Sequence, residues 1–321
     1  MTQQQNGDFS PINLKSFIID TKINFDLYML HPSQNRHVLF SSKNTQFSDA
    51  TRKILLDNKV PSLYISPCDY DLYLQYIEKY LNRIISNTTI ATPQKSEWIF
   101  ECAKKITHDT LDNPDVRKNI RRSTTFVKNL VGFITKERSY FPHVQKLFET
   151  DYSLSCHSIN VCMYALALCV AMGESSLKIL EGVGMGCLLH DIGMTVIPHD
   201  ILHKDGALDE LERETIQKHP EFSTQLLNNL SVKNELIYDI AKSHHEKLDG
   251  SGYPIGLKGD DIPSHTRIVA IADIFDALTS QRPHRDAFPT YQAFKILIND
   301  FEGKVDGDIL KKFVTLFQNK K

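Results

Sequence analysis

The sequence predicts a mainly α fold, in which a C-terminal all-α domain follows a small α+β domain and a helical linker. Two observations carry this prediction. From residue 139 onward, apolar residues recur at helical spacing in almost every segment. Before residue 86, short apolar runs bounded by loop residues are mixed with helical patterns, which is typical of an α+β domain. The 321 residues are enough for two or three domains.

The first 14 residues are polar and are expected to form a disordered tail, since they lack the hydrophobic core of a secretory signal. Residues 15–86 make up the predicted α+β domain, and we expect it to be regulatory. Its expected elements are a β-hairpin over 25–30 and 37–40, a helix over 48–58, a strand over 62–65 and a helix over 70–85.

Residues 87–138 form the predicted helical linker, because helical spacing follows Thr92-Pro93 and breaks near Asn113-Pro114. A helical hairpin and a coiled signalling stalk both fit this pattern, and a stalk could support a homodimer. The last predicted domain, 139–321, has helical segments over 154–172, 177–190, 208–229, 234–245, 264–280 and 291–300. A loop rich in Gly and Pro separates the fourth and fifth of these segments.

Composition argues against several classes of partner. The formal net charge is -2, so no basic excess favours duplex DNA or an anionic membrane surface. The longest apolar run, Val161 to Met172, is too short for a bilayer crossing of roughly 20 residues, so we expect no membrane span. None of the six cysteines forms a CxxC pair, which indicates a cytoplasmic protein without disulfides.

Residues of the metal-ligating types gather in the second half of the chain. Adjacent His190 and Asp191 could place an imidazole and a carboxylate on one metal cluster, although a lone His-Asp pair is more often a hydrogen-bonded helix end. His244 and His245 end an apolar helical segment, and neutral imidazole is the commonest metal ligand. Asp273 is informative by itself, because a carboxylate inside an apolar helix is costly to bury unless it is paired or metal-bound.

The remaining candidates are weaker alone. His157 and His219 lie in helical patterns and would, taken singly, be structural or exposed. Asp276 lies three residues after Asp273 and could cap the helix or support a ligand from behind. The full set of five histidines and two aspartates suits Fe, Mn, Zn or Ni better than Mg or Ca. Seven ligands suit two metals that share a carboxylate, a pair that typically lies about 3.5–4 Å apart and clamps a phosphoryl group.

These motifs resemble the HD-GYP subgroup of the HD superfamily of metal-dependent phosphohydrolases. The resemblance covers roughly residues 140–320, and the small domain before it resembles one often found ahead of HD-GYP modules. It rests on six stretches: His157-Ser158-Ile159-Asn160-Val161, His190-Asp191-Ile192-Gly193, Lys218-His219-Pro220, His244-His245-Glu246 with Asp249 to Pro254, Ala272-Asp273, and Arg282-Pro283-His284-Arg285.

The resemblance implies a phosphodiesterase that hydrolyses cyclic di-GMP to pGpG, or onward to GMP. Two divalent ions, Fe or Mn, would activate a bridging hydroxide for attack in line with the leaving 3′ oxygen. Asp191 would bridge the ions, and Asp191 and His190 are the expected catalytic residues. The implied ligands are His157, His190, Asp191 and Asp273 for one ion, and His219, His244 and His245 with the bridging Asp191 for the other.

The same resemblance implies substrate contacts and partners. Arg282 and Arg285 match positions that contact the substrate phosphate, and Tyr253 with Gly252 belongs to the loop for which the subgroup is named. A diguanylate cyclase with a GGDEF domain would be a possible protein partner.

Three residues depart from the family pattern. Met194 stands where a lysine would supply a cation to the substrate, Ser153 stands where a glutamate would hold a third metal, and His284 replaces a tyrosine. We therefore expect two metals, and Met194 keeps open a second hypothesis, a metal-bound sensor or interaction module with little turnover. A third hypothesis is a hydrolase for a related cyclic dinucleotide such as a cyclic GMP-AMP.

Overall fold

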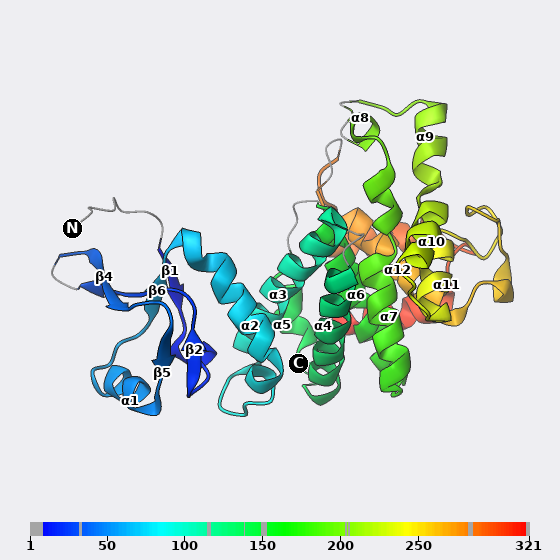
Figure 1. Ribbon diagram of the computed structural model, residues 1–321. Helices are drawn as coiled ribbons and strands as arrows, with labels where there is room; N and C mark the ends of the chain where they lie inside the picture. Colours follow the sequence, from blue (N-terminus) through cyan, green and yellow to red (C-terminus); the bar gives the residue numbers. More distant parts are fainter. Residues whose placement is uncertain are drawn as a thin grey trace. The chain divides into compact units, whose positions relative to one another are not determined.

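The computed structural model describes residues 9–31, 34–113, 117–137, 139–148, 153–202, 204, 206–281 and 285–318. The chain divides into two compact units, Met1–Cys102 and Ala103–Lys321 (Figure 1). The boundary lies well after the predicted end of the α+β domain at residue 86, and each unit is described by itself.

The first unit is built on a four-stranded antiparallel sheet in the order β1-β6-β3-β4, with a two-stranded β2-β5 ribbon and two helices. The predicted hairpin, the strand over 62–65 and both helices are confirmed. The elements are β1 Ser10–Ile12, β2 Thr21–Ile23, β3 Leu27–His31, β4 Arg36–Ser41, β5 Thr45–Phe47, α1 Asp49–Asp57, β6 Leu63–Ile65 and α2 Tyr70–Ile85.

The predicted disordered tail is wrong for its last residues. Strand β1 pairs with β6, and Ile12 is buried in the core of the unit. A three-residue strand that contains Pro11 carries almost no periodic signal, and proline is tolerated here because β1 is an edge strand. Strands β2 and β5 were missed for the same reason of length.

The predicted linker is helical but is not a separate element. Helices α3 Thr92–Asp112 and α4 Arg117–Lys136 form a hairpin, in which the Asp109 side chain pairs with Arg122 at 2.8 Å. The apolar face of α4 is buried against α6 and α7, and Val127 touches the surface of α7 at Gly184. The hairpin alternative therefore holds, and the linker from residue 103 onward is part of the second unit.

The second unit is all helical among the residues described. Its further elements are α5 Phe141–Gln145, α6 Leu154–Ala171, α7 Leu177–Leu189, the 3₁₀ turn η3 Ile192–Val196, α8 His199–Leu202, α9 Glu210–Gln217, α10 His219–Asn229, α11 Glu235–Ser243, the 3₁₀ turn η4 Gly259–Asp261, α12 Ser264–Thr279, α13 Thr290–Asp300 and α14 Gly307–Phe317. The predicted helix over 208–229 is two helices, because Pro220 in the first turn of α10 cannot continue the hydrogen bonds of α9.

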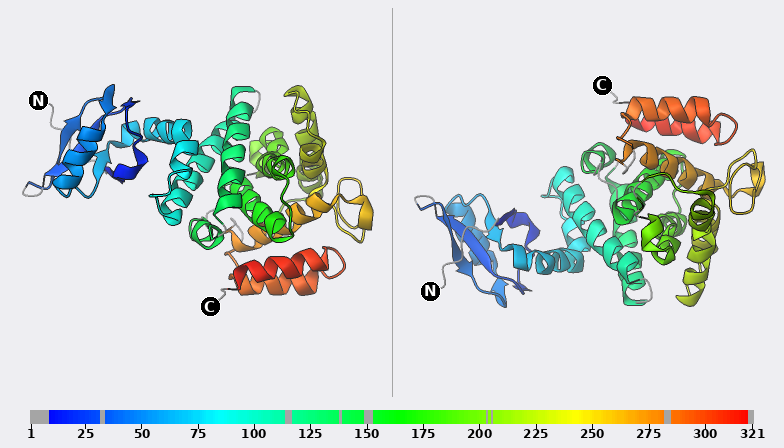
Figure 2. Two further views of the ribbon diagram at one scale, coloured as in Figure 1. Left: turned by 90° about the horizontal axis from the view of Figure 1, so that it is seen from below. Right: turned by 90° about the horizontal axis from the view of Figure 1, so that it is seen from above.

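Helix α6 is the centre of this unit and packs against α7, α12 and α14. An aromatic cluster joins it to the last three helices: Tyr164 contacts Phe275 and Phe313, Phe275 contacts Phe313, and Phe294 contacts Phe313 and Phe317. In both views of Figure 2, α13 and α14 lie side by side at one edge of the unit. The core therefore holds α6, α7 and α12 in fixed positions, and these helices carry four of the candidate ligands.

Two segments are long and apolar enough to cross a membrane by length and composition, Leu154–Ala171 and Leu177–Val196. Most of each segment, 78% and 72%, is buried inside the unit, which is typical of core helices. No disulfide joins any of the six cysteines, all of which lie within the described residues, and five of them are buried.

Candidate metal centre

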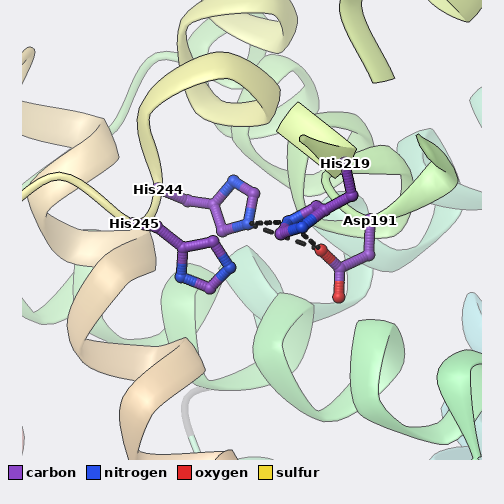
Figure 3. A group of neighbouring side chains, drawn as sticks. All are labelled: Asp191, His219, His244 and His245. Carbon is purple, nitrogen blue, oxygen red and sulfur yellow. Dashed lines mark hydrogen bonds and ion pairs between the residues drawn. The ribbon is translucent and has the colours of Figure 1, made fainter. Parts of the chain in front are cut away.

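The structure brings together all seven residues that the sequence singled out as metal ligands. They come from five places in the fold: His157 on α6, His190 and Asp191 after α7, His219 at the start of α10, His244 and His245 after α11, and Asp273 on α12. Their donor atoms form two groups in which every atom lies within 4.8 Å of the others, Asp191 with His219, His244 and His245, and His157 with His190 and Asp273. Figure 3 shows the first group.

Asp191 lies between the two groups, and its two oxygens face different histidines. Oδ2 is 3.4 Å from Nε2 of His190 and 3.7 Å from Nε2 of His157. Oδ1 is 3.1 Å from Nε2 of His219 and 3.4 Å from Nε2 of His244 (Figure 3). The carboxylate is therefore oriented as a bridging ligand would be.

Asp273 also reaches both groups from inside the apolar helix α12. Its Oδ1 is 3.1 Å from Nε2 of His157, and its Oδ2 is 3.5 Å from Nδ1 of His245. The side chain is 8% exposed. The sequence singled out Asp273 because a carboxylate inside an apolar helix is costly to bury without a partner. In the structure the imidazoles of His157 and His245 are those partners.

Three ligand histidines are held by main-chain carbonyls of the turn that precedes them. The bonds run from Nδ1 of His190, His219 and His244 to the carbonyls of Cys187, Ile216 and Ile240, at 2.7, 2.8 and 2.9 Å. A carbonyl can only accept, so Nδ1 carries the proton and Nε2 keeps its lone pair. The lone pairs of these histidines are thus directed at the cluster, as metal binding requires.

His157 is held by a carboxylate instead. Its Nδ1 donates to Asp276 Oδ2 at 2.7 Å, and Asn160 and Ser280 donate to the same carboxylate at 2.9 and 3.3 Å. Asp276 is 1% exposed and does not itself lie in either donor group. A carboxylate behind a ligand histidine fixes the ring and raises its basicity.

The protonation states suit a cation. Burial lowers the pKa of His190 to about 4, and burial with the neighbouring His244 lowers the pKa of His245 well below its usual range. Burial would raise the pKa values of Asp191 and Asp273, but the surrounding histidines outweigh it and hold both below the ordinary range. His190 and His245 are therefore neutral and both aspartates are ionised, the forms that bind metal.

Two observations test whether a metal fits. Nε2 of His219 lies 3.3 Å from Nε2 of His244, and because Nδ1 of each ring faces a carbonyl, a cation between or beside the two lone pairs would stabilise this arrangement. Within the described part of the chain, His190 Nε2 and Asp191 Oδ1 are also buried without a well-formed hydrogen bond. Because buried polar atoms are nearly always partnered, these atoms fit the coordination of a metal ion.

The loop after α11 forms the side of the cluster next to His245. The Tyr253 ring lies 4.6 Å from the His245 ring, at an angle of 31° between the ring planes. Burial and the charges of Asp273 and Asp191 raise the pKa of the Tyr253 hydroxyl, so it stays protonated. Gly252 leaves no space for a side chain, since a Cβ there would lie 2.5 Å from the His245 carbonyl oxygen.

The two arginines predicted to contact substrate differ in what the structure shows. Arg282 lies outside the described residues, as does His284. Arg285 donates to the carbonyls of Ala277 and Leu278 at 2.6 and 3.1 Å and lies over the Phe288 ring. Its guanidinium caps the end of α12, and a phosphate contact by Arg285 stays a prediction.

The two other departures from the family pattern are both described. Ser153 caps α6, because its hydroxyl accepts from the Cys156 amide at 3.1 Å. Met194 is half-buried in η3, and its amide donates to the Asp191 carbonyl at 2.9 Å.

Three residues to which sequence reasoning assigned no role also shape the site. Gly193 lets η3 approach α10, since a Cβ at this position would lie 2.1 Å from the His219 carbonyl oxygen. Ser223 links the same two elements, accepting from the Gly193 amide and donating to the His190 carbonyl. Glu246 is buried and accepts from three amides of the loop that carries Tyr253. Glu246 follows the histidine pair directly, which was the one signal that could have pointed to it.

Comparison with known proteins agrees with this arrangement. Residues 143–309, just over half of the chain, match the family model described as HD domain. The 3′3′-cGAMP-specific phosphodiesterase 2 of Vibrio cholerae is 37% identical over 186 residues, 57% of this chain and 33% of that protein. The cyclic di-GMP phosphodiesterase PA4108 of Pseudomonas aeruginosa is 31% identical over 204 residues, 62% of this chain and 49% of that protein. The chain thus spans between a third and a half of the length of these relatives.

One solved structure is similar over nearly the whole chain. Bd1817, described as a HDG"Y"P protein from Bdellovibrio bacteriovorus, matches with a TM-score of 0.68 and 22% identity, and covers 96% of this chain and 99% of that one. At this identity the likeness shows the fold. Together with the family match, it leads to one conclusion: this chain belongs to the HD domain family.

Proposed function

We propose that this protein is a metal-dependent phosphodiesterase that opens a cyclic dinucleotide, cyclic di-GMP in the first instance, to the linear pGpG. The observation that carries the proposal is Asp191, whose two oxygens face histidines of two separate donor groups. The relatives of Vibrio cholerae and Pseudomonas aeruginosa, which are named for cyclic dinucleotide hydrolysis, support the substrate class.

The donor set would hold two divalent ions, Fe or Mn, one in each group with Asp191 between them. Imidazole and carboxylate donors together favour these metals over Mg or Ca. When bound, such a pair supplies a water of lowered pKa and neutralises the charge of a phosphoryl group.

The protein's own residues prepare the site for this chemistry. The carbonyls of Cys187, Ile216 and Ile240 and the carboxylate of Asp276 hold four imidazoles in a fixed orientation, so none of these rings has to turn when a cation enters. The Tyr253 ring lies against His245, the most exposed of the ligands, and would line the entry for substrate.

Met194 supports a second candidate, a metal-bound binding module with low turnover. A methionine beside Asp191 offers no cation to a substrate phosphate, whereas the complete set of buried ligands favours catalysis. A third candidate is the hydrolysis of 3′3′-cGAMP, because a relative with that specificity is 37% identical. A cytoplasmic location, a homodimer and a diguanylate cyclase partner remain predictions from the sequence.

One experiment separates the three candidates. Protein purified without chelator would be analysed for metal content, then loaded with Fe or Mn and incubated with cyclic di-GMP, 3′3′-cGAMP or a linear dinucleotide. We expect two ions per chain and chromatographed pGpG from cyclic di-GMP. Two ions with binding but no linear product in either metal would rule out the enzyme, and faster turnover of 3′3′-cGAMP would reassign the substrate.

Met194→Lys sharpens the result in the same assay. If the missing cation limits turnover, the variant should hydrolyse cyclic di-GMP faster than the wild type at unchanged metal content. An unchanged rate would show that this position does not govern activity.

A further inference from the structure

Glu246 is a buried carboxylate directly after the ligand pair His244 and His245. It is 4% exposed, and three successive backbone amides donate to it. Oε1 accepts from the amides of Ile255 and Gly256 at 2.7 and 3.1 Å, and Oε2 accepts from those of Gly256 and Leu257 at 3.1 and 3.0 Å. A buried anion with both oxygens occupied by main-chain donors is a strong local anchor, because hydrogen bonds to a charged group are about twice as strong as neutral ones.

These three amides belong to the loop that carries Tyr253. The loop also packs closely on the ligand turn, since Gly252 lies against the His245 carbonyl and the Tyr253 amide donates to that carbonyl at 3.3 Å. The bonds to Glu246 come from the residues shortly after Tyr253, so the loop is fastened both at the tyrosine and beyond it. The carboxylate thus fastens the loop a few residues beyond Tyr253.

Two facts argue against Glu246 as a metal ligand. It belongs to neither donor group, and its oxygens already face four N–H contacts from the loop. Its bonds instead hold the loop that carries the Tyr253 ring, and this ring lies 4.6 Å from the His245 ring and 6.3 Å from the His219 ring.

We propose that Glu246 is a positioning residue, which holds the loop 249–257 as a fixed wall of the metal centre and through Tyr253 sets how tightly a cyclic dinucleotide binds. This inference rests on the proposed function for its substrate. The wall itself is a property of the fold, and it can be tested without turnover.

The variant that tests it is Glu246→Gln, which keeps shape and volume. The glutamine side chain has an NH₂ group in place of one carboxylate oxygen, so at least one backbone N–H of the loop would face another donor. The negative charge of the carboxylate is lost as well. The matched control is Glu235→Gln, an exposed carboxylate in the first turn of α11, the helix that precedes Glu246. Both variants would be metal-loaded as full chains, and metal content would be measured first.

We expect Glu246→Gln to keep its metals and kcat and to raise KM for cyclic di-GMP about tenfold, the value of one lost hydrogen bond to a charged group. In a Tyr253→Ala background the same substitution should change KM less than twofold, because the residue it positions is gone. Hydrogen exchange at the amides of residues 255–257 should speed up at least about tenfold in Glu246→Gln and stay unchanged in Glu235→Gln.

The outcomes are distinct. Loss of metal in parallel with loss of activity would make Glu246 part of the metal centre and overturn the inference. An equal rise in KM with and without Tyr253 would show that Glu246 does not act through the loop. If the wild type hydrolyses no cyclic dinucleotide, the proposed function fails, and the exchange measurement still decides whether Glu246 holds the loop.

Discussion

The two halves of the metal centre are built differently. In the first half, His157, His190 and Asp273 come from α6, α7 and α12 and are at most 8% exposed. In the second half, His219 and His244 are equally buried, but the His245 side chain is 25% exposed and lies against the Tyr253 loop. The first half is therefore set by the helical core, and the second also depends on a loop, where a substrate would enter.

Asp191→Ala should break both halves together. The substitution removes the oxygens that face His190 and His157 on one side and His219 and His244 on the other. Removal of a residue that only supports a metal ligand lowers the affinity by up to about 100-fold. Because Asp191 would itself be a ligand, we expect the metal affinity to fall by more than this and product formation to cease. Metal analysis and chromatography would measure this, with exposed Asp200→Ala as control. Retention of either ion would contradict the bridging position of Asp191.

Asp276→Asn should weaken the first half alone. Asparagine keeps the volume but replaces the carboxylate that accepts from Nδ1 of His157 at 2.7 Å. We expect a loss of about 10–100-fold in affinity for one metal ion, with the second ion retained. Competitive titration with a chelator would resolve the two sites. Ser280→Ala, which removes only the 3.3 Å bond to Asp276, should have a much smaller effect.

Gly193→Ala should disturb the second half through the backbone. The new Cβ would lie 2.1 Å from the His219 carbonyl oxygen and 2.5 Å from the Ser223 nitrogen, so α10 would have to move. We expect the free energy of unfolding to fall by about 2 kcal/mol, within the usual cost of overpacking. Denaturant unfolding of the metal-free protein would measure it. Gly132→Ala in α4, where a Cβ would meet no atom within 4 Å apart from its chain neighbours and the backbone of its own helix, should not destabilise the protein.

When the metal-free protein is acidified, histidines in the two halves of the centre should become protonated at different pH values. Burial lowers the pKa of His190 to about 4. Burial opposes protonation of His219 as well, but the hydrogen bond and charge of Asp191 raise its pKa above the usual 6.5. Histidine ring spectra recorded by NMR during titration should show His219 protonating first, so the metal affinity of the second half should fall first.

The sign of the accompanying stability change follows from the same values. Between pH 6.5 and about 4 the unfolded chain binds a proton at residue 190 that the folded protein does not bind, so this histidine makes the free energy of unfolding fall as the pH drops. His219 acts in the opposite sense, and its stabilising contribution is lost as the pH rises through its raised pKa. A His190 that titrates near 6.5 in the folded protein would contradict the buried, neutral state.

The helices and the ligands were accessible to sequence reasoning because each leaves a local signal. Asp273 breaks an apolar helical pattern, and the histidine pair ends one. The resemblance to a known family then connected residues that lie far apart in the chain. The long helices α2, α6 and α12 were predicted within a residue or two because their apolar periodicity extends over four or more turns.

What could not be predicted depends on contacts between distant segments. Strand β1 exists because Ser10 to Ile12 find β6 more than 50 residues later. The linker became part of the second unit because the face of α4 fits α7 at Gly184. The roles of Gly193 and Glu246 arise from the approach of two backbones, and a single sequence does not record which backbones meet.

The carbonyl bonds of His190 and His244 have a consequence for engineering. Both residues follow the last turn of a helix, α7 and α11, and each donates to a carbonyl of that turn. The Cys187 carbonyl is one of the last of α7, which have no backbone partner within the helix, whereas the Ile240 carbonyl accepts from the His244 amide as well as from its ring. A scaffold given the same seven side chains on uninterrupted helices would lack the helix ends at which these carbonyls accept from the rings. To transplant this centre into another protein, one would have to move its helix ends along with its ligands.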